Sequence, residues 1–124
     1  MDTSIKILIV DDFATMRRIL KNILKQLGFK DFVEADDGST AWDELQGQKI
    51  DLIISDWNMP KMTGIEFLKK VRASDVYKTT PFLMVTAEAQ KQNVIEAVQA
   101  GVSNYIVKPF TAEAISEKLE KILK

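Results

Sequence analysis

The stretch Ile7-Leu8-Ile9-Val10-Asp11-Asp12 decides the fold. Its four consecutive apolar residues indicate a β-strand buried on both faces, as in parallel sheets. A similar run, Ile53-Ile54-Ser55-Asp56, also ends in a carboxylate. If the two runs are neighbouring parallel strands, three acidic groups meet at one edge of a sheet. Like charges so close disfavour joint ionisation unless a cation or a proton intervenes.

The overall composition is typical of one soluble globular domain. The chain has 124 residues, of which 46% are hydrophobic and 28% charged. Lys and Arg number 17 against 18 Asp and Glu, so the net charge of -1 predicts no nucleic-acid partner. We expect no membrane insertion, because charged residues interrupt every apolar run. The N-terminus lacks the pattern of a signal peptide, which predicts a cytoplasmic protein.

Two residue types are missing, and their absence narrows the chemistry. The sequence has no Cys and no His. This excludes disulfides, thiolate zinc sites, a Ser-His-Asp triad and imidazole metal ligands. The glycine-rich motifs of P-loop nucleotidases and dinucleotide-binding folds are also missing. Chemistry based on oxygen ligands and lysine remains.

Apolar runs alternate with segments of helical period along the whole chain. The strands are expected at Ile5–Val10, Phe32–Asp36, Ile50–Ser55, Phe82–Thr86 and Ser103–Val107. The second is short and alternating, which suits an edge strand. The helical segments are marked by the stripe from Met16 to Leu27, by Trp42 and Leu45, by the Thr63–Glu66 capping box, by Val94 to Gly101, and by Thr111 to Ile122. Five β-α units predict an α/β fold with a doubly wound parallel sheet.

The residues that could carry chemistry stand at the ends of the predicted strands. They are Asp11, Asp12, Asp56, Thr86 and Lys108. In doubly wound sheets the ligand crevice lies beyond the carboxyl ends of the strands, so we expect these residues to meet. Asp12 and Asp56 with one backbone carbonyl would suffice for Mg²⁺, which would also relieve the repulsion among the carboxylates.

Asp56 could also act as a nucleophile, because a carboxylate can attack phosphorus and form an aspartyl-phosphate. Such a transfer depends on positioning and charge neutralisation. Mg²⁺ would let an anionic phosphoryl group approach, Lys108 would add a second positive charge, and Thr86 would donate from its hydroxyl. Taken singly, Lys108 is as easily a solvated surface lysine and Thr86 a β-branched strand residue. Their shared position at strand ends favours the functional interpretation.

Together these residues resemble the receiver domains of two-component signalling. The motifs are Asp11-Asp12, Asp56 with Met59-Pro60 and Gly64, Thr86, and Lys108-Pro109-Phe110. The stretches 10–18, 55–60, 85–89 and 104–111 are similar to the single-domain chemotaxis response regulators within that family. The resemblance covers essentially the whole chain. It implies a flavodoxin-like (βα)5 fold with strand order 2-1-3-4-5 and one receiver domain over residues 1–124, without an output domain.

The resemblance also implies roles for individual residues. Asp56 would be the phosphoacceptor, and Asp12, Asp56 and the backbone carbonyl of Asn58 would bind Mg²⁺, with Asp11 acting through water. Lys108 would pair with the phosphoryl group across a cis Lys108-Pro109 bond, although the sequence alone favours trans. Thr86 would move toward the phosphate and Tyr105 would turn inward. The partner-binding surface would comprise Ala89, Lys91, Val94, Tyr105 and Lys118, although a plain solvated helix face would look much the same.

The predicted function is therefore a phosphorylation-switched signalling protein of chemotaxis. A chemotaxis histidine kinase would donate the phosphoryl group to Asp56, and the phosphorylated form would bind a flagellar motor switch protein. A dedicated phosphatase is a further candidate partner. We expect a monomer that assists its own phosphorylation and autodephosphorylation but is not a turnover enzyme.

One alternative to this function is a close second, and the sequence disfavours two others. A single-domain phosphorelay intermediate or phosphate sink would pass the phosphoryl group to another histidine, although Trp57-Asn58 favours chemotaxis. A small metal-dependent phosphatase would need a general acid where Asn58 stands, and a substrate-covering cap. A flavodoxin-like electron carrier would offer hydroxyls and amides to its phosphate, whereas Asp11-Asp12 would repel it.

Overall fold

Five parallel strands form one sheet in the order β2-β1-β3-β4-β5. The computed structural model describes residues 2–87 and 91–123. The strands are β1 (Lys6–Val10), β2 (Asp31–Ala35), β3 (Leu52–Asp56), β4 (Phe82–Thr86) and β5 (Asn104–Val107). The helices are α1 (Ala14–Gln26), α2 (Gly38–Gly47), α3 (Gly64–Ala73), α4 (Lys91–Gln99) and α5 (Ala112–Ile122). The predicted flavodoxin-like α/β fold and its strand order are confirmed.

The burial of each strand follows its place in the sheet. Every residue of the interior strands β3 and β4 is buried, and β1 is buried after its first residue. Strand β2 lies at an edge and buries only Ala35 fully, as its alternating sequence predicts. Strand β3 begins at Leu52 rather than Ile50 and includes Asp56. The phosphoacceptor candidate is therefore part of a rigid element.

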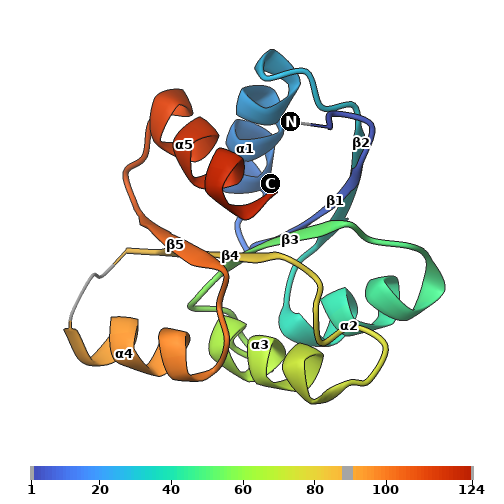
Figure 1. Cartoon of the computed structure of the whole chain (residues 1–124), viewed down its shortest axis with the longest axis vertical. Coiled ribbons are helices and arrows are strands. Elements are labelled where there is room, and N and C mark those ends of the chain that lie inside the picture. The colour runs from blue at the N-terminus through green and yellow to red at the C-terminus, as the bar shows by residue number, and fades with distance from the viewer. Residues whose placement is uncertain (1, 88–90, 124) are drawn as a thin grey trace.

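Helices cover both faces of the sheet, with α1 and α5 on one face and α2, α3 and α4 on the other (Figure 1). The first layer packs Leu24 and Leu119 against Ile9 and Ile54 of the sheet. The second layer has its own core, which includes Phe67 of α3. The apolar runs that are buried on both faces thus explain the two-layer cover.

Capping residues fix several of the helix ends. Thr63 and Glu66 form the predicted capping box of α3, with Thr63 N–H donating to Glu66 Oε1 at 3.0 Å. Thr111 caps α5 as predicted. Gly101 follows α4 with φ of +92°, a conformation that favours glycine. Val98 of α4 is 61% exposed, because this helix buries only Ala97 against the core.

Arg72 of α3 holds the two loops that lead into β4 and β5. Its Nε donates to the Gly101 carbonyl at 2.8 Å and its Nη1 to the Thr80 carbonyl at 2.7 Å.

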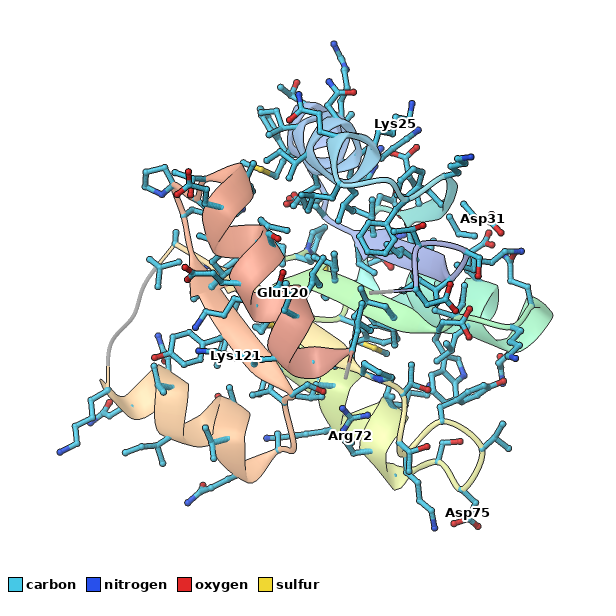
Figure 2. The ribbon with its side chains drawn as sticks, turned by 45° about the horizontal axis from the view of Figure 1, so that its top comes forward. Lys25, Asp31, Arg72, Asp75, Glu120 and Lys121 are labelled. Carbon is cyan, nitrogen blue, oxygen red and sulfur yellow. The ribbon has the colours of Figure 1, made fainter. Side chains whose placement is uncertain are left out.

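Labelled charges of both signs, including Lys25, Asp75 and Glu120, are spread over the face in Figure 2. Within residues 2–87 and 91–123, none of the helices has the length and apolar character needed to cross a membrane.

Candidate functional site

The predicted site residues meet at the carboxyl edge of the sheet. Asp11 and Asp12 follow β1, Asp56 ends β3, Thr86 ends β4 and Lys108 follows β5. These strands are parallel and in register, so their carboxyl ends share one edge. The carboxylates of Asp11, Asp12 and Asp56 each place an oxygen within 4.8 Å of the other two. The convergence expected from the sequence is present.

Lys108 reaches into this cluster from β5. Its Nζ lies 3.0 Å from Asp56 Oδ1 and 3.5 Å from Asp11 Oδ2. Its backbone N–H donates to the Thr86 carbonyl at 2.8 Å, which fixes the lysine beside the end of β4. The Lys108-Pro109 peptide is cis, as the family resemblance implied and against the preference of the sequence alone.

The electrostatics of the cluster are set by burial. Asp11 and Asp56 are 1% and 7% exposed, whereas Asp12 is exposed. Burial raises the pKa of Asp11, and the charge of Asp12 adds to this. Burial likewise raises the pKa of Asp56, with the charge of Asp11 adding, while Lys108 opposes the shift. Burial works against the charge of Lys108, but its hydrogen bond to Asp56 and both carboxylate charges raise the lysine pKa overall.

One buried oxygen shows that the site fits a cation. Asp11 Oδ2 is fully buried and, within the described part of the chain, makes no hydrogen bond, with Lys108 Nζ 3.5 Å away. A buried carboxylate oxygen without a hydrogen bond is costly. The donors here are all oxygens, which suit a hard cation such as Mg²⁺ better than a softer metal. Asp11, Asp12 and Asp56 could therefore hold such an ion.

The loop between β3 and α3 folds back over the backbone of Asp56. Trp57 N–H donates to the Val85 carbonyl at 2.9 Å, and Gly64 N–H donates to the Trp57 carbonyl at 2.8 Å. A Cβ on Gly64 would overlap the Asp56 carbonyl oxygen. Asn58 is exposed in this loop, two residues after Asp56. Its predicted role as a carbonyl ligand stays a prediction.

The predicted switch residues border one small hollow beside the site. The hollow has a volume of about 10 Å³ and is lined by Trp57, Met84, Thr86, Asn93, Val94, Ala97 and Tyr105. Thr86 is buried and Tyr105 half-buried, with Lys118 Nζ 5.5 Å from the centre of the Tyr105 ring. Lys91 is exposed at the start of α4, and Ala89 lies outside the described residues. Val94, Tyr105 and Lys118 therefore lie together, and the role of the whole set as a partner-binding surface stays a prediction.

Some exposed apolar side chains were not predicted as site residues. Phe13 directly follows the acidic pair and is 63% exposed, and Ile95 on α4 is 44% exposed. The sequence signal for Phe13 was its position directly after two aspartates and before the apolar stripe of the first helix. Arg17 was also missed. Its Nη1 donates to the Asp11 carbonyl at 2.6 Å, and this contact depends on how α1 folds back toward β1.

Comparison with known proteins places the chain in a family. The family described as the response regulator receiver domain matches residues 7–120, so the chain belongs to this family. It is 59% identical over 117 residues to the chemotaxis protein CheY of Pseudomonas aeruginosa, covering 94% of each chain. It is 56% identical over 122 residues to the chemotaxis protein CheY-3 of Vibrio cholerae serotype O1, covering 98% of this chain and 94% of the relative.

Solved structures agree with this assignment. The chemotaxis response regulator CheY4 of Vibrio cholerae has a TM-score of 0.88 and 38% identity, with 97% of this chain and 99% of that chain covered. A signal receiver domain of a signal transduction histidine kinase from Syntrophus aciditrophicus has a TM-score of 0.88 and 28% identity, with 97% and 90% covered. The resemblance to chemotaxis receivers read from the motifs is confirmed.

Proposed function

We propose that this chain is a phosphorylation-switched signalling protein of chemotaxis, in which Asp56 accepts a phosphoryl group from a kinase phosphohistidine with the help of Mg²⁺. The observation that carries the proposal is the pairing of Lys108 Nζ with Asp56 Oδ1 at 3.0 Å among three converging carboxylates. The relatives named as chemotaxis proteins support the pathway. A cytoplasmic monomer fits this function.

The proposed transfer uses residues at and after the carboxyl ends of β1, β3 and β5. Asp12, Asp56 and the Asn58 carbonyl would hold Mg²⁺, with Asp11 acting through water, and the bound ion supplies positive charge for the phosphoryl oxygens. An Asp56 carboxylate oxygen forms the new bond to phosphorus while the bond from phosphorus to the histidine nitrogen breaks. The imidazole keeps the bonding electron pair. Lys108 can then exchange its contact with Asp56 for one with a phosphoryl oxygen.

The proposed switch passes through Thr86 to the surface around Tyr105. Phosphorylation adds about -1.5 to -2 charge at pH 7, and a hydroxyl that reaches it gains a charge-assisted hydrogen bond. Inverting a 1:99 population needs about 5.5 kcal/mol. Two or three such bonds at about 1.5–3 kcal/mol each add up to about 3–9 kcal/mol, a range that includes this amount. The output surface would be Ala89, Lys91, Val94, Tyr105 and Lys118, and its partner a flagellar motor switch protein.

A phosphorelay intermediate or phosphate sink is the second candidate, because the same acceptor chemistry can pass the group to another histidine. In either case the chain assists its own phosphorylation and autodephosphorylation and is not a turnover enzyme acting on a free substrate. A dedicated phosphatase would be a further partner. Pull-down of the motor switch protein with and without a phosphodonor separates the two candidates, since a relay or sink would gain no affinity for it.

The acceptor chemistry is tested by intact mass. Incubation with Mg²⁺ and a small acyl phosphate should add one phosphoryl group to the native chain and none to Asp56→Asn. Asp43→Asn, an exposed aspartate on α2, is the matched control and should behave like the native chain. A chelator should abolish the adduct. An adduct that survives in Asp56→Asn would contradict the proposal, and sustained release of phosphate from a free substrate would favour a phosphatase.

A further inference from the structure

Arg17 contacts the acidic loop from α1 through the backbone. Its Nη1 donates to the Asp11 backbone carbonyl at 2.6 Å, and its side chain is 18% exposed. Asp11 itself is 1% exposed, so this carbonyl lies where a missing hydrogen bond would be costly. The carbonyl belongs to the peptide that joins Asp11 to Asp12. Arg17 therefore fixes the peptide plane between the two aspartates.

The loop has few other anchors. The Asp11 N–H donates to the Ala35 carbonyl at 3.1 Å, and the Phe13 N–H donates to Asp11 Oδ1 at 2.9 Å. Phe13 is the N-cap residue of α1, and its side chain makes no capping hydrogen bond. A helix start of this kind lacks the side-chain acceptor that usually fixes the entering chain. The charge-assisted bond from Arg17, one turn into the helix, instead holds the entering chain at the Asp11 carbonyl.

Arg17 is itself held by β2. Its Nε lies 3.0 Å from Glu34 Oε1, and Lys21 Nζ lies 3.2 Å from Glu34 Oε2. Glu34 thus receives two cations from α1, only one of which reaches the acidic loop. Two donors of one planar guanidinium are used in fixed directions, toward Glu34 and toward Asp11.

We propose that Arg17, oriented by Glu34, is a positioning residue for the Mg²⁺ site: it sets the direction of the Asp12 carboxylate by holding the Asp11-Asp12 peptide. It touches neither the metal nor the phosphoryl group. This inference rests on the proposed function, since it assumes that Asp12 is a ligand. Groups that orient metal ligands commonly change metal affinity by 10- to 100-fold when they are removed.

The surroundings of Arg17 make a direct test practicable. An open hollow of about 320 Å³ is lined by Arg17, Glu34, Ala35, Asp36, Thr40 and Glu44. In Arg17→Ala the space of the missing guanidinium would be open to this hollow. A small guanidinium ion, such as ethylguanidinium at millimolar concentration, could enter and bind in its place. Arg18→Ala is the matched control, because Arg18 is the exposed neighbour with the same charge.

The experiment is a calorimetric titration of the metal-free chain with Mg²⁺. Arg17→Ala should raise the dissociation constant about tenfold, Arg18→Ala should leave it near the native value, and ethylguanidinium should restore affinity in Arg17→Ala alone. The carbonyl carbon resonance of Asp11, read by NMR before Mg²⁺ is added, should move in Arg17→Ala and not in Arg18→Ala. Glu34→Gln should weaken Mg²⁺ binding severalfold, and it tests the orienting pair even if Arg17→Ala does not fold.

The outcomes separate this inference from the proposed function. A native chain that does not bind Mg²⁺ would overturn both. Native binding with unchanged affinity in Arg17→Ala, equal losses in Arg17→Ala and Arg18→Ala, or no recovery with ethylguanidinium would overturn the inference alone. If only Glu34→Gln can be measured, native affinity in that variant would overturn it as well. At saturating Mg²⁺ the phosphorylation rate of Arg17→Ala should return to the native plateau, because its defect is in binding the ion.

Discussion

Lys108 and Asp56 form a direct ion pair, with Nζ and Oδ1 separated by 3.0 Å, although Lys108 follows β5 and Asp56 ends β3, with β4 between these strands. The pair places a positive charge beside the Asp56 carboxylate, which is the proposed nucleophile. Asp11 shares the same lysine at 3.5 Å. The lysine therefore offsets part of a repulsion that burial strengthens.

Removing that lysine should destabilise the chain and stop efficient phosphorylation. Lys108→Met should lower the free energy of unfolding by about 1–2 kcal/mol at pH 7 without Mg²⁺, because Asp56 loses a charged partner. The pKa of Asp56 should rise further, since Lys108 no longer opposes the effect of burial. Urea unfolding gives the first quantity. Lys121→Met, at an exposed position on α5, is the control, and an equal loss there would contradict the assignment.

The acidic cluster should make the metal-free chain less stable as pH rises. Burial raises the pKa of Asp11 above its ordinary 3.8, so the folded state holds more protons than the unfolded state just above that pH. The contribution of the Asp11 carboxyl to the free energy of unfolding is fully present below pH 3.8, and it is lost as pH rises through the raised pKa. Asp11→Asn removes this loss of stability with rising pH, and its side-chain oxygen can still accept the hydrogen bond from the Phe13 N–H.

The measurement is urea unfolding of native protein and Asp11→Asn with a chelator at several pH values. As pH rises from about 4 to 7, the free energy of unfolding of the variant should increase relative to that of the native chain by on the order of 1 kcal/mol. Added Mg²⁺ should stabilise the native chain and shrink the difference. A difference that does not change with pH would show that the cluster is not the cause.

Gly64 should be essential for the geometry of the acceptor. A Cβ at this position would overlap the Asp56 carbonyl oxygen and contact Met84 Sδ, so Gly64→Ala must push the β3–α3 loop away. We expect a loss of about 2 kcal/mol or more in the free energy of unfolding and slower phosphorylation of Asp56. Gly47→Ala is the matched control, because nothing lies within 4 Å of its added Cβ. It should be neutral or slightly stabilising. Equal effects at both glycines would contradict the close approach.

The hydroxyl of Thr86 should matter for the response and not for the acceptor chemistry itself. Thr86→Val keeps the branched shape but cannot donate to the phosphoryl group, whereas Thr86→Ser keeps the hydroxyl. Both should form the phosphorylated adduct by intact mass. The gain in affinity for the motor switch protein on phosphorylation should be about tenfold smaller in Thr86→Val than in the native chain. This is the loss expected for one charge-assisted hydrogen bond. Native behaviour of Thr86→Val in a binding titration would contradict the switch.

Much of the fold and the chemical centre could be predicted because local signals agreed. The interior strands are apolar throughout, so their parallel pairing and the meeting of Asp56 with Asp11-Asp12 followed from position alone. The Thr63–Glu66 capping box was equally local. The exposure of Val98 could not be predicted, because helical period shows which residues share a face but not how much of α4 packs on the sheet.

The features that could not be predicted depend on distances between elements. The hydrogen bond from Arg17 to the Asp11 carbonyl depends on the angle at which α1 leaves β1. The approach of Gly64 to the Asp56 carbonyl depends on the path of a loop. The cis Lys108-Pro109 bond entered only through the family resemblance, since an X-Pro bond is usually trans.

The central claim is that the Asp56 carboxylate becomes an acyl phosphate, and reductive labelling tests it most directly. Borohydride reduces an aspartyl-phosphate to homoserine, so the native chain should be treated with Mg²⁺ and a small acyl phosphate, reduced and sequenced by mass spectrometry. We predict homoserine in place of Asp56 and unmodified Asp11 and Asp12, with no conversion when Mg²⁺ is chelated. Homoserine at Asp11 or Asp12, or a phosphorylated chain with none at position 56, would contradict the claim.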